Sequence, residues 1–165
     1  MSTLSSLAGL VGNWRGLNRL WLSPAAPVRE SETAGVVALA AQGQFVTFQY
    51  TWSDEGAPQD GLLLVGYEAE TQAVRAVWID SWHLHDRFML CSGTVAAGGA
   101  VTLQGVYAAP PGPDWGWRIQ IAPQNENLFD LVMHNLSPEG KADLAVEARY
   151  VRQRRRIRLA GQRKG

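Results

Sequence analysis

Residues 101–136, VTLQGVYAAPPGPDWGWRIQIAPQNENLFDLVMHNL, decide the fold because short apolar runs alternate there with turn-forming residues. Three runs rich in Val, Leu, Ile, Phe, Tyr and Trp are separated by APPGPD and APQNEN. Branched and aromatic side chains favour strands, whereas Gly, Pro, Asn and Asp favour turns. The segment therefore predicts three successive strands, at 100–108, 115–122 and 127–136.

The same alternation continues through the rest of the chain. It predicts further strands at 13–22, 32–40, 44–53, 61–69, 73–82, 87–96 and 142–152. Only LSSLAGLVG, near the start, has the apolar spacing of a short helix. Helical segments of about 10–15 residues between the strands would indicate a parallel sheet, and the sequence has none.

Strands joined in sequence by short connections favour an antiparallel meander. A single open sheet of this size would leave exposed edges, and closure into a barrel removes them. Such a barrel has more interior than its own side chains easily fill. We therefore expect an all-β fold, a ten-stranded antiparallel up-and-down β-barrel with a short N-terminal helix and an internal cavity.

Length, cysteine content and hydropathy limit the class of protein. A chain of 165 residues fits one domain, which we place at residues 1–152. The single cysteine, Cys91, excludes an internal disulfide framework and is typical of a reducing compartment. No apolar stretch approaches the roughly 18 residues of a membrane span, and the N-terminus lacks the basic region of a signal peptide. These features predict a cytoplasmic protein that does not associate with a membrane.

A net charge of zero hides an asymmetry along the chain. All 15 acidic residues lie at or before Glu147, whereas residues 149–165 hold eight bases. An arginine-rich end can bind nucleic acid by releasing counterions, but no aromatic residues are interleaved to stack on bases. We therefore expect the basic tail, residues 153–165, to be solvated or to lie on an acidic surface rather than on nucleic acid.

Alternation along each strand assigns side chains to the interior. Three aromatic faces are expected to converge there: Val46, Phe48, Tyr50 and Trp52; Val74, Ala76, Trp78, Asp80 and Trp82; Trp115, Trp117, Ile119 and Ile121. Asp80 is unusual in such a place, because a buried carboxylate needs a partner. A polar group of a ligand or a buried arginine such as Arg118 would serve.

Residues 78–91, WIDSWHLHDRFMLC, are predicted to be two strands and a turn whose inward side chains face a pocket. Aromatic walls with a few polar groups are the usual composition of a small-molecule site. Trp78, Trp82 and Trp117 are expected to form walls, with Asp80 and His83 for polar recognition near the mouth. The full predicted ligand-binding set is Tyr50, Trp52, Trp78, Asp80, Trp82, His83, Tyr107 and Trp117.

Three alternatives remain open. His83 and His85 could chelate a metal if both lay on one strand face, but no Glu follows at a suitable spacing, and we predict neither a metal nor a cofactor. Asp80 with either histidine could form an acid–base pair, although no nucleophile motif accompanies it and Cys91 resembles a small buried hydrophobe. The third alternative is a homodimeric scaffold whose barrel is filled by its own side chains.

Several motifs, taken in order, resemble a bacterial family called "domain of unknown function 1579". They are LVGNWRGLNRLWL, GLLLVGYEAETQAV, VWIDSWH, CSGTV, GVYAAPPGPDWGWR and LVMHNLSPEGKADLAVEARYVR. The resemblance covers about residues 7–152 and implies a lipocalin-like, calycin-type barrel with an internal cavity but no particular activity.

The G-x-W-x-G pattern at residues 12–16 resembles the opening of calycins, and this resemblance implies that Trp14 plugs one barrel end. A more distant resemblance, to nitrobindin-type haem barrels, would require an axial histidine on a late strand. His134 is the one candidate for it.

Overall fold

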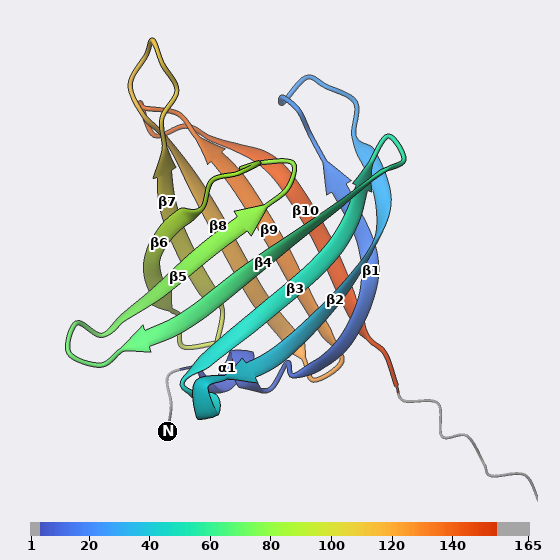
Figure 1. Ribbon diagram of the computed structural model, residues 1–165, viewed down its shortest axis with the longest axis vertical. Coiled ribbons are helices and arrows are strands. Elements are labelled where there is room, and N and C mark those ends of the chain that lie inside the picture. Colours follow the sequence, from blue (N-terminus) through green and yellow to red (C-terminus); the bar gives the residue numbers. More distant parts are fainter. Residues whose placement is uncertain (1–3, 155–165) are drawn as a thin grey trace, which may run out of the picture.

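The computed structural model describes residues 4–154 and shows a closed barrel of antiparallel strands (Figure 1). The described elements are α1 (Ser5–Ala8), β1 (Gly12–Leu20), β2 (Arg29–Ala40), η1 (Ala41–Gly43), β3 (Phe45–Asp54), β4 (Ala57–Glu68), β5 (Ala73–Asp80), β6 (Met89–Val95), β7 (Val101–Tyr107), β8 (Trp115–Asn125), β9 (Leu128–Leu136) and β10 (Ala142–Arg152). Each strand pairs with its neighbours in sequence, and β1 pairs with β10 to close the barrel. The predicted fold class is confirmed. Of the predicted tail, residues 155–165 lie outside the described residues.

Two of the predicted breaks are wrong because tighter turns replace them. Residues 53–60, SDEGAPQD, were expected to interrupt the sheet, yet β3 and β4 pair from Asp54 and Ala57 onward. Glu55 and Gly56, with φ of 49° and 85°, make the whole turn, as two-residue hairpins with left-handed backbone do. Likewise β8 runs through APQN to Asn125, with a register shift beside Pro123.

A third prediction, the strand at 73–82, is wrong at its end, since β5 stops at Asp80. One carboxylate oxygen of Asp80, Oδ1, accepts the backbone N–H groups of Trp82 and His83, each at 2.9 Å. An aspartate that bonds to backbone amides just ahead of it favours a turn over a strand. Trp82 and His83 therefore lie on a connection, residues 81–88, which we call the mouth loop.

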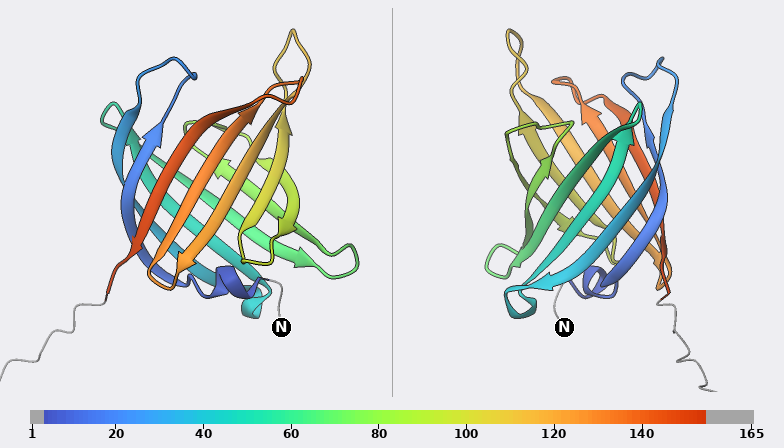
Figure 2. Two further views of the ribbon diagram at one scale, coloured as in Figure 1. Left: turned by 180° about the vertical axis from the view of Figure 1, so that it is seen from behind. Right: turned by 45° about the vertical axis from the view of Figure 1, so that its right-hand side comes forward.

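One end of the barrel is packed with aromatic side chains and capped by α1 (Figure 2). Trp14 is 1% exposed, its ring meets Phe129 edge-on at 4.7 Å, and its Nε1 donates to the carbonyl of Leu10 at 2.8 Å. The implied plug is therefore present. The hollow beneath α1 holds only about 10 Å³ of space for water, at the limit for a single molecule.

Arg152 stabilises this closed end by contacts on its outer side. Its guanidinium lies 4.3 Å above the centre of the Trp14 ring. It also donates to the carbonyl oxygens of Val11, Gly9 and Glu126, at 2.7, 2.9 and 2.6 Å. The arginine thereby joins β10 to the segment that leads from α1 into β1.

Candidate functional site

We call the end of the barrel away from α1 the mouth (Figure 1). Four tryptophans surround one histidine there. The mouth loop turns His83 inward, so that its side chain is only 10% exposed. Its ring centre lies between 4.7 and 5.7 Å from the ring centres of Trp52, Trp78, Trp82 and Trp117. These five side chains form what we call the aromatic cage.

Asp80 supports the cage from below and is 2% exposed. Its Oδ2 accepts a hydrogen bond from the Tyr50 hydroxyl at 2.8 Å, and that hydroxyl accepts from Trp78 Nε1 at 2.8 Å. Its Oδ1 lies 3.0 Å from Nδ1 of His83, besides the two backbone amides that it accepts. Because an indole N–H can only donate, the hydrogen bonds run from Trp78 through the Tyr50 hydroxyl to the carboxylate of Asp80.

These hydrogen bonds satisfy Asp80 without a buried arginine, which was one of the two partners considered from the sequence. Arg118 alternates along β8 with the buried Trp117 and Ile119, so it faces away from the interior, and the expectation that it pairs with Asp80 is wrong. The partners of Asp80 are instead Tyr50 and two residues of the mouth loop, Trp82 and His83.

The surroundings keep Asp80 ionised and Tyr50 protonated. Burial by itself would raise the pKa of the Asp80 carboxyl, but the hydrogen bonds and charge of His83, with the Tyr50 hydroxyl, outweigh it and hold the pKa below its ordinary value. Burial, followed by the charge of Asp80, raises the pKa of the Tyr50 phenol well above its ordinary value. The phenol therefore remains a donor and the carboxylate an acceptor.

Two hollows adjoin the cage. One holds about 470 Å³ and the other about 300 Å³, and both are lined by Trp82, His83 and Trp117. The first is completed by Trp78, Leu84, His85, Asp86, Arg87, Met89, Tyr107 and Ala108, and the second by Leu20, Trp21, Leu22, Ser23, Pro24, Trp115, Asn135, Asp143, Leu144 and Ala145. Their sizes lie at the lower end of those that small-molecule sites occupy.

Two polar atoms of the cage are buried without a hydrogen-bond partner, Nε2 of His83 and Nε1 of Trp117. The two rings lie 5.3 Å apart, centre to centre. Trp117 is also stacked on Trp78, at 5.5 Å and an interplanar angle of 11°, so its N–H is held in place. Buried polar atoms are rarely left unpaired in folded proteins, and those that are call for an explanation.

The structure brings all eight residues of the predicted ligand-binding set to the mouth half of the barrel. Tyr50 and Asp80 lie beneath the cage as supports, whereas Tyr107 lines the larger hollow and donates to Asn135 Oδ1 at 2.7 Å. Met89, Asn135 and residues 20–24 also line the hollows but are not in the predicted set. Strand alternation from Met133 would have found Asn135, but residues 20–24 carried no signal.

The histidines do not assemble a metal or haem site in the described residues. His83 points inward and His85 is exposed, so the two do not face one ion as the strand reading required. In residues 4–154 no three His, Cys, Asp or Glu side chains are grouped so as to hold a metal. His134 alternates with the buried Met133 and faces outward, so the implied axial ligand is wrong for a haem inside the barrel.

Cys91 is buried on β6, and burial raises the pKa of its thiol to about 11. A thiol with so little thiolate is a poor nucleophile, so its predicted role as a small buried hydrophobe is confirmed.

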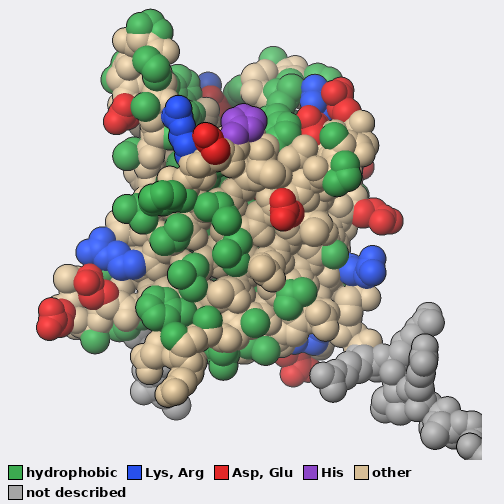
Figure 3. All heavy atoms as spheres, viewed as in Figure 1, with side chains coloured by type: hydrophobic (Ala, Val, Ile, Leu, Met, Phe, Trp, Pro, Cys, Tyr) green, Lys and Arg blue, Asp and Glu red, His purple; other side chains and the backbone are tan. Residues whose placement is uncertain are grey.

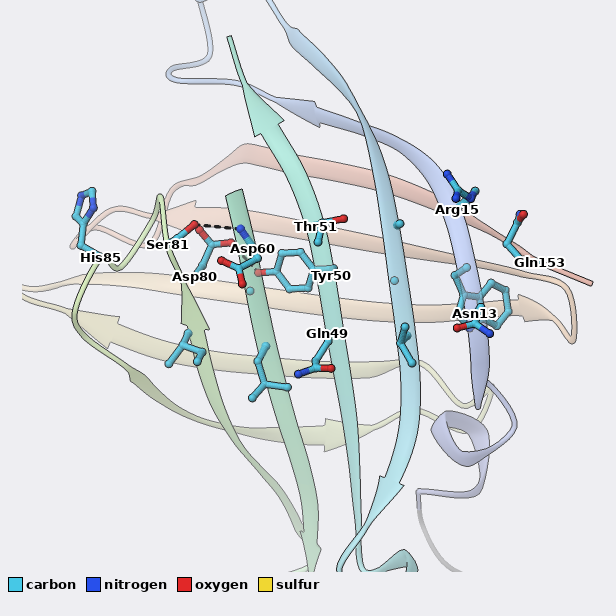
Figure 4. A pocket seen from close by; sticks show the side chains of 17 residues that line it. Asn13, Arg15, Gln49, Tyr50, Thr51, Asp60, Asp80, Ser81, His85 and Gln153 are labelled. Atoms are coloured by element: carbon cyan, nitrogen blue, oxygen red, sulfur yellow. Dashed lines mark hydrogen bonds between the residues drawn. The ribbon is translucent and has the colours of Figure 1, made fainter. Parts of the chain in front are cut away.

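A separate hollow of about 850 Å³ lies on the outer face of β1–β5 (Figure 4). It is lined mostly by side chains that point away from the interior, such as Arg15, Gln49 and Thr51. At one edge Ser81 accepts the backbone N–H of Asp60 at 3.1 Å. None of the described side chains that line it has a buried polar atom without a hydrogen-bond partner, as His83 and Trp117 have at the mouth.

Hydrophobic side chains also gather on the outer face of β3, β4, β5 and β6 (Figure 3). Leu90, at 68% exposed, and Ile79 and Phe45, each near 40%, contribute to it. Contiguous exposed apolar surface often marks a contact between proteins.

A closed, lipocalin-like β-barrel with an aromatic mouth is the class of protein that these features define. The chain belongs to the family described as "Protein of unknown function (DUF1579)", whose family model matches residues 3–152. No curated protein matches it. In the described residues, none of the helices has the length and apolar character needed to cross a bilayer.

Two solved structures share the fold. The S-type phycobiliprotein lyase CPES from Guillardia theta is 17% identical, with a TM-score of 0.64 over 93% of this chain and 94% of that one. Rv2717c from M. tuberculosis is 16% identical, with a TM-score of 0.64 over 92% of this chain and 98% of that one. At such identities the likeness extends to the fold alone.

Proposed function

We propose that the barrel binds a small, partly apolar molecule in its mouth. The observation that carries this proposal is the pair of hollows, about 470 and 300 Å³, that flank one tryptophan-walled cage at the unfilled end. An aromatic wall around few polar groups is what such sites generally contain. The fold itself is compatible with a site, since one barrel of this shape is named a lyase.

Each cage residue then has a distinct role. Trp78, Trp82 and Trp117 form the apolar walls, and His83 supplies the polar contact through Nε2. Asp80 acts through His83, because its own oxygens already accept hydrogen bonds from protein groups. It orients the imidazole rather than touching the ligand.

Native mass spectrometry of protein purified without added ligand tests the proposal. We expect a mass above that of the polypeptide in the wild type, which Trp82→Ala loses and Leu90→Ala, on the outer face, keeps. A bare polypeptide mass, together with no heat of binding for 2-methylnaphthalene, would contradict the proposal. The same spectra report whether two copies pair, for which the apolar outer face around Leu90 is the proposed surface.

Acid–base catalysis in the mouth is the second candidate, favoured by the pairing of Asp80 with His83. A carboxylate that holds Nδ1 leaves Nε2 free to take a proton, as a general base requires. A screen of ester and enolisable carbonyl substrates tests it. We expect turnover that disappears in His83→Gln. Turnover that survives the substitution would place the chemistry elsewhere.

A further inference from the structure

We propose that the ligand of the mouth carries a hydroxyl group that bridges His83 and Trp117. Its oxygen accepts a hydrogen bond from Trp117 Nε1, and its hydrogen is donated to His83 Nε2. The inference rests on the proposed function and names the chemical class of the ligand, an uncharged alcohol or phenol with a flat apolar body.

The direction of the bond at His83 follows from Asp80. The ionised carboxylate can only accept, so the nitrogen 3.0 Å from it, Nδ1, must carry the proton. A hydrogen bond donated to Nε2 requires the uncharged imidazole, in which this nitrogen is an acceptor with a free lone pair. No described protein group donates to that nitrogen, and His83 lines both hollows.

Trp117, in contrast, requires a hydrogen-bond acceptor. Its Nε1–H can only donate, and it too is buried without a partner. The rings of His83 and Trp117 are neighbours, with their centres 5.3 Å apart, and both side chains line the two hollows. The cage therefore holds one unpaired acceptor and one unpaired donor on adjacent rings.

Other functional groups fit this pair less well. A carbonyl or carboxylate would satisfy Trp117 but place a lone pair against that of His83, and a carboxylate would also lie near the charge of Asp80. An ammonium group would donate to His83 and leave Trp117 unpaired. A purely apolar group would leave both atoms unpaired. A hydroxyl both donates and accepts, and Trp82 and Trp117 offer ring faces to the flat body beside it.

Isothermal titration of the full chain with three matched probes tests the hydroxyl. The probes, 2-naphthol, 2-methylnaphthalene and 2-naphthoate, share the flat body and differ in the polar group. We expect 2-naphthol to bind at least about tenfold more tightly than either of the others, since a site built around a hydroxyl rejects analogues that lack one. Its binding should also shift the ¹⁵N resonance of His83 Nε2.

Trp117→Phe keeps an aromatic ring and removes only the indole N–H. It should bring 2-naphthol to within about threefold of 2-methylnaphthalene, because the methyl compound never used that bond. Leu90→Ala, on the outer face of the barrel and away from both hollows, is the control and should keep the full preference.

Equal binding of the three probes, tightest binding of 2-naphthoate, or an unchanged preference in Trp117→Phe would each overturn the hydroxyl bridge. In these cases the two cage atoms hold water or another group, and the mouth remains a binding site. Failure of every probe to bind would overturn the bridge and the proposed function together.

Discussion

The two ends of the barrel use the same residue types for opposite purposes. At the closed end, Trp14 Nε1 donates to a backbone carbonyl and the Tyr150 hydroxyl lies 2.8 Å from Thr33 Oγ1, so both polar atoms are paired. At the mouth, Trp117 Nε1 and His83 Nε2 are equally buried and unpaired. The hollow under α1 holds about 10 Å³, against about 470 Å³ beside the cage.

This difference separates packing from recognition. A tryptophan whose ring is enclosed and whose N–H is paired within the protein stabilises the fold. A tryptophan that borders a hollow, as Trp82 and Trp117 do, contributes less to stability and is available to a ligand. The four substitutions that follow test this division, from the largest expected effect to the smallest.

Trp14→Ala should destabilise the protein by about 3–5 kcal/mol, because it empties the closed end of a fully buried ring. Urea unfolding followed by circular dichroism measures the loss. Molecules that remain folded should bind 2-naphthol with unchanged affinity. A small loss of stability together with lost binding would reverse the roles assigned to the two ends.

Asp80→Asn should cost about 1–3 kcal/mol, since its amide nitrogen cannot accept the bonds that the carboxylate oxygen accepts. The folded pKa of Asp80 lies below the unfolded value, so its ionisation stabilises the protein above the unfolded pKa of about 3.9. This contribution is lost as the pH falls through the folded pKa.

Unfolding of wild type and Asp80→Asn at pH 5 and at progressively lower pH measures this effect. The difference in stability between the two proteins should shrink only below about pH 3.9. A difference that shrinks at higher pH would mean that Asp80 is not held in its ionised form by His83 and Tyr50.

Trp82→Ala should weaken the binding of 2-methylnaphthalene by about tenfold while costing less than about 1.5 kcal/mol of stability, because the ring is only partly buried. Titration calorimetry and urea unfolding give the two values. If the substitution were as destabilising as Trp14→Ala, the mouth would be a second packed core.

Leu90→Ser, on the outer face, should change stability by less than about 0.5 kcal/mol and leave binding intact. Size-exclusion chromatography with light scattering shows whether the substitution alters the molar mass. Loss of naphthol binding would connect the outer face to the site.

The sequence predicted much of the fold because strand alternation is a local signal. It placed Trp78 and Asp80 on the same face as each other, and it placed Trp117 with Ile119, as the structure does. It failed at the end of β5, where Asp80 turns the chain by binding its own backbone two and three residues ahead. Trp82 therefore faces inward because of this turn, which strand alternation does not predict.

The partners of Asp80 could not be predicted either. Tyr50 lies 30 residues earlier, on β3, and meets Asp80 only because Gly61 stands between them in the sheet. A Cβ at Gly61 would lie 2.3 Å from the Tyr50 ring, so that the glycine makes room for the phenol. Contacts of this kind depend on register and on the absence of a side chain, which a single strand pattern does not show.

The most direct test of the central claim, that ligands enter the mouth and not the closed end, is an NMR titration of the indole N–H signals with 2-naphthol. The chain has seven tryptophans, and they sample both ends. The signals of Trp117 and Trp82 should shift as the probe is added, whereas the signal of Trp14 should stay in place. A shift of Trp14 with Trp117 unmoved would contradict the claim.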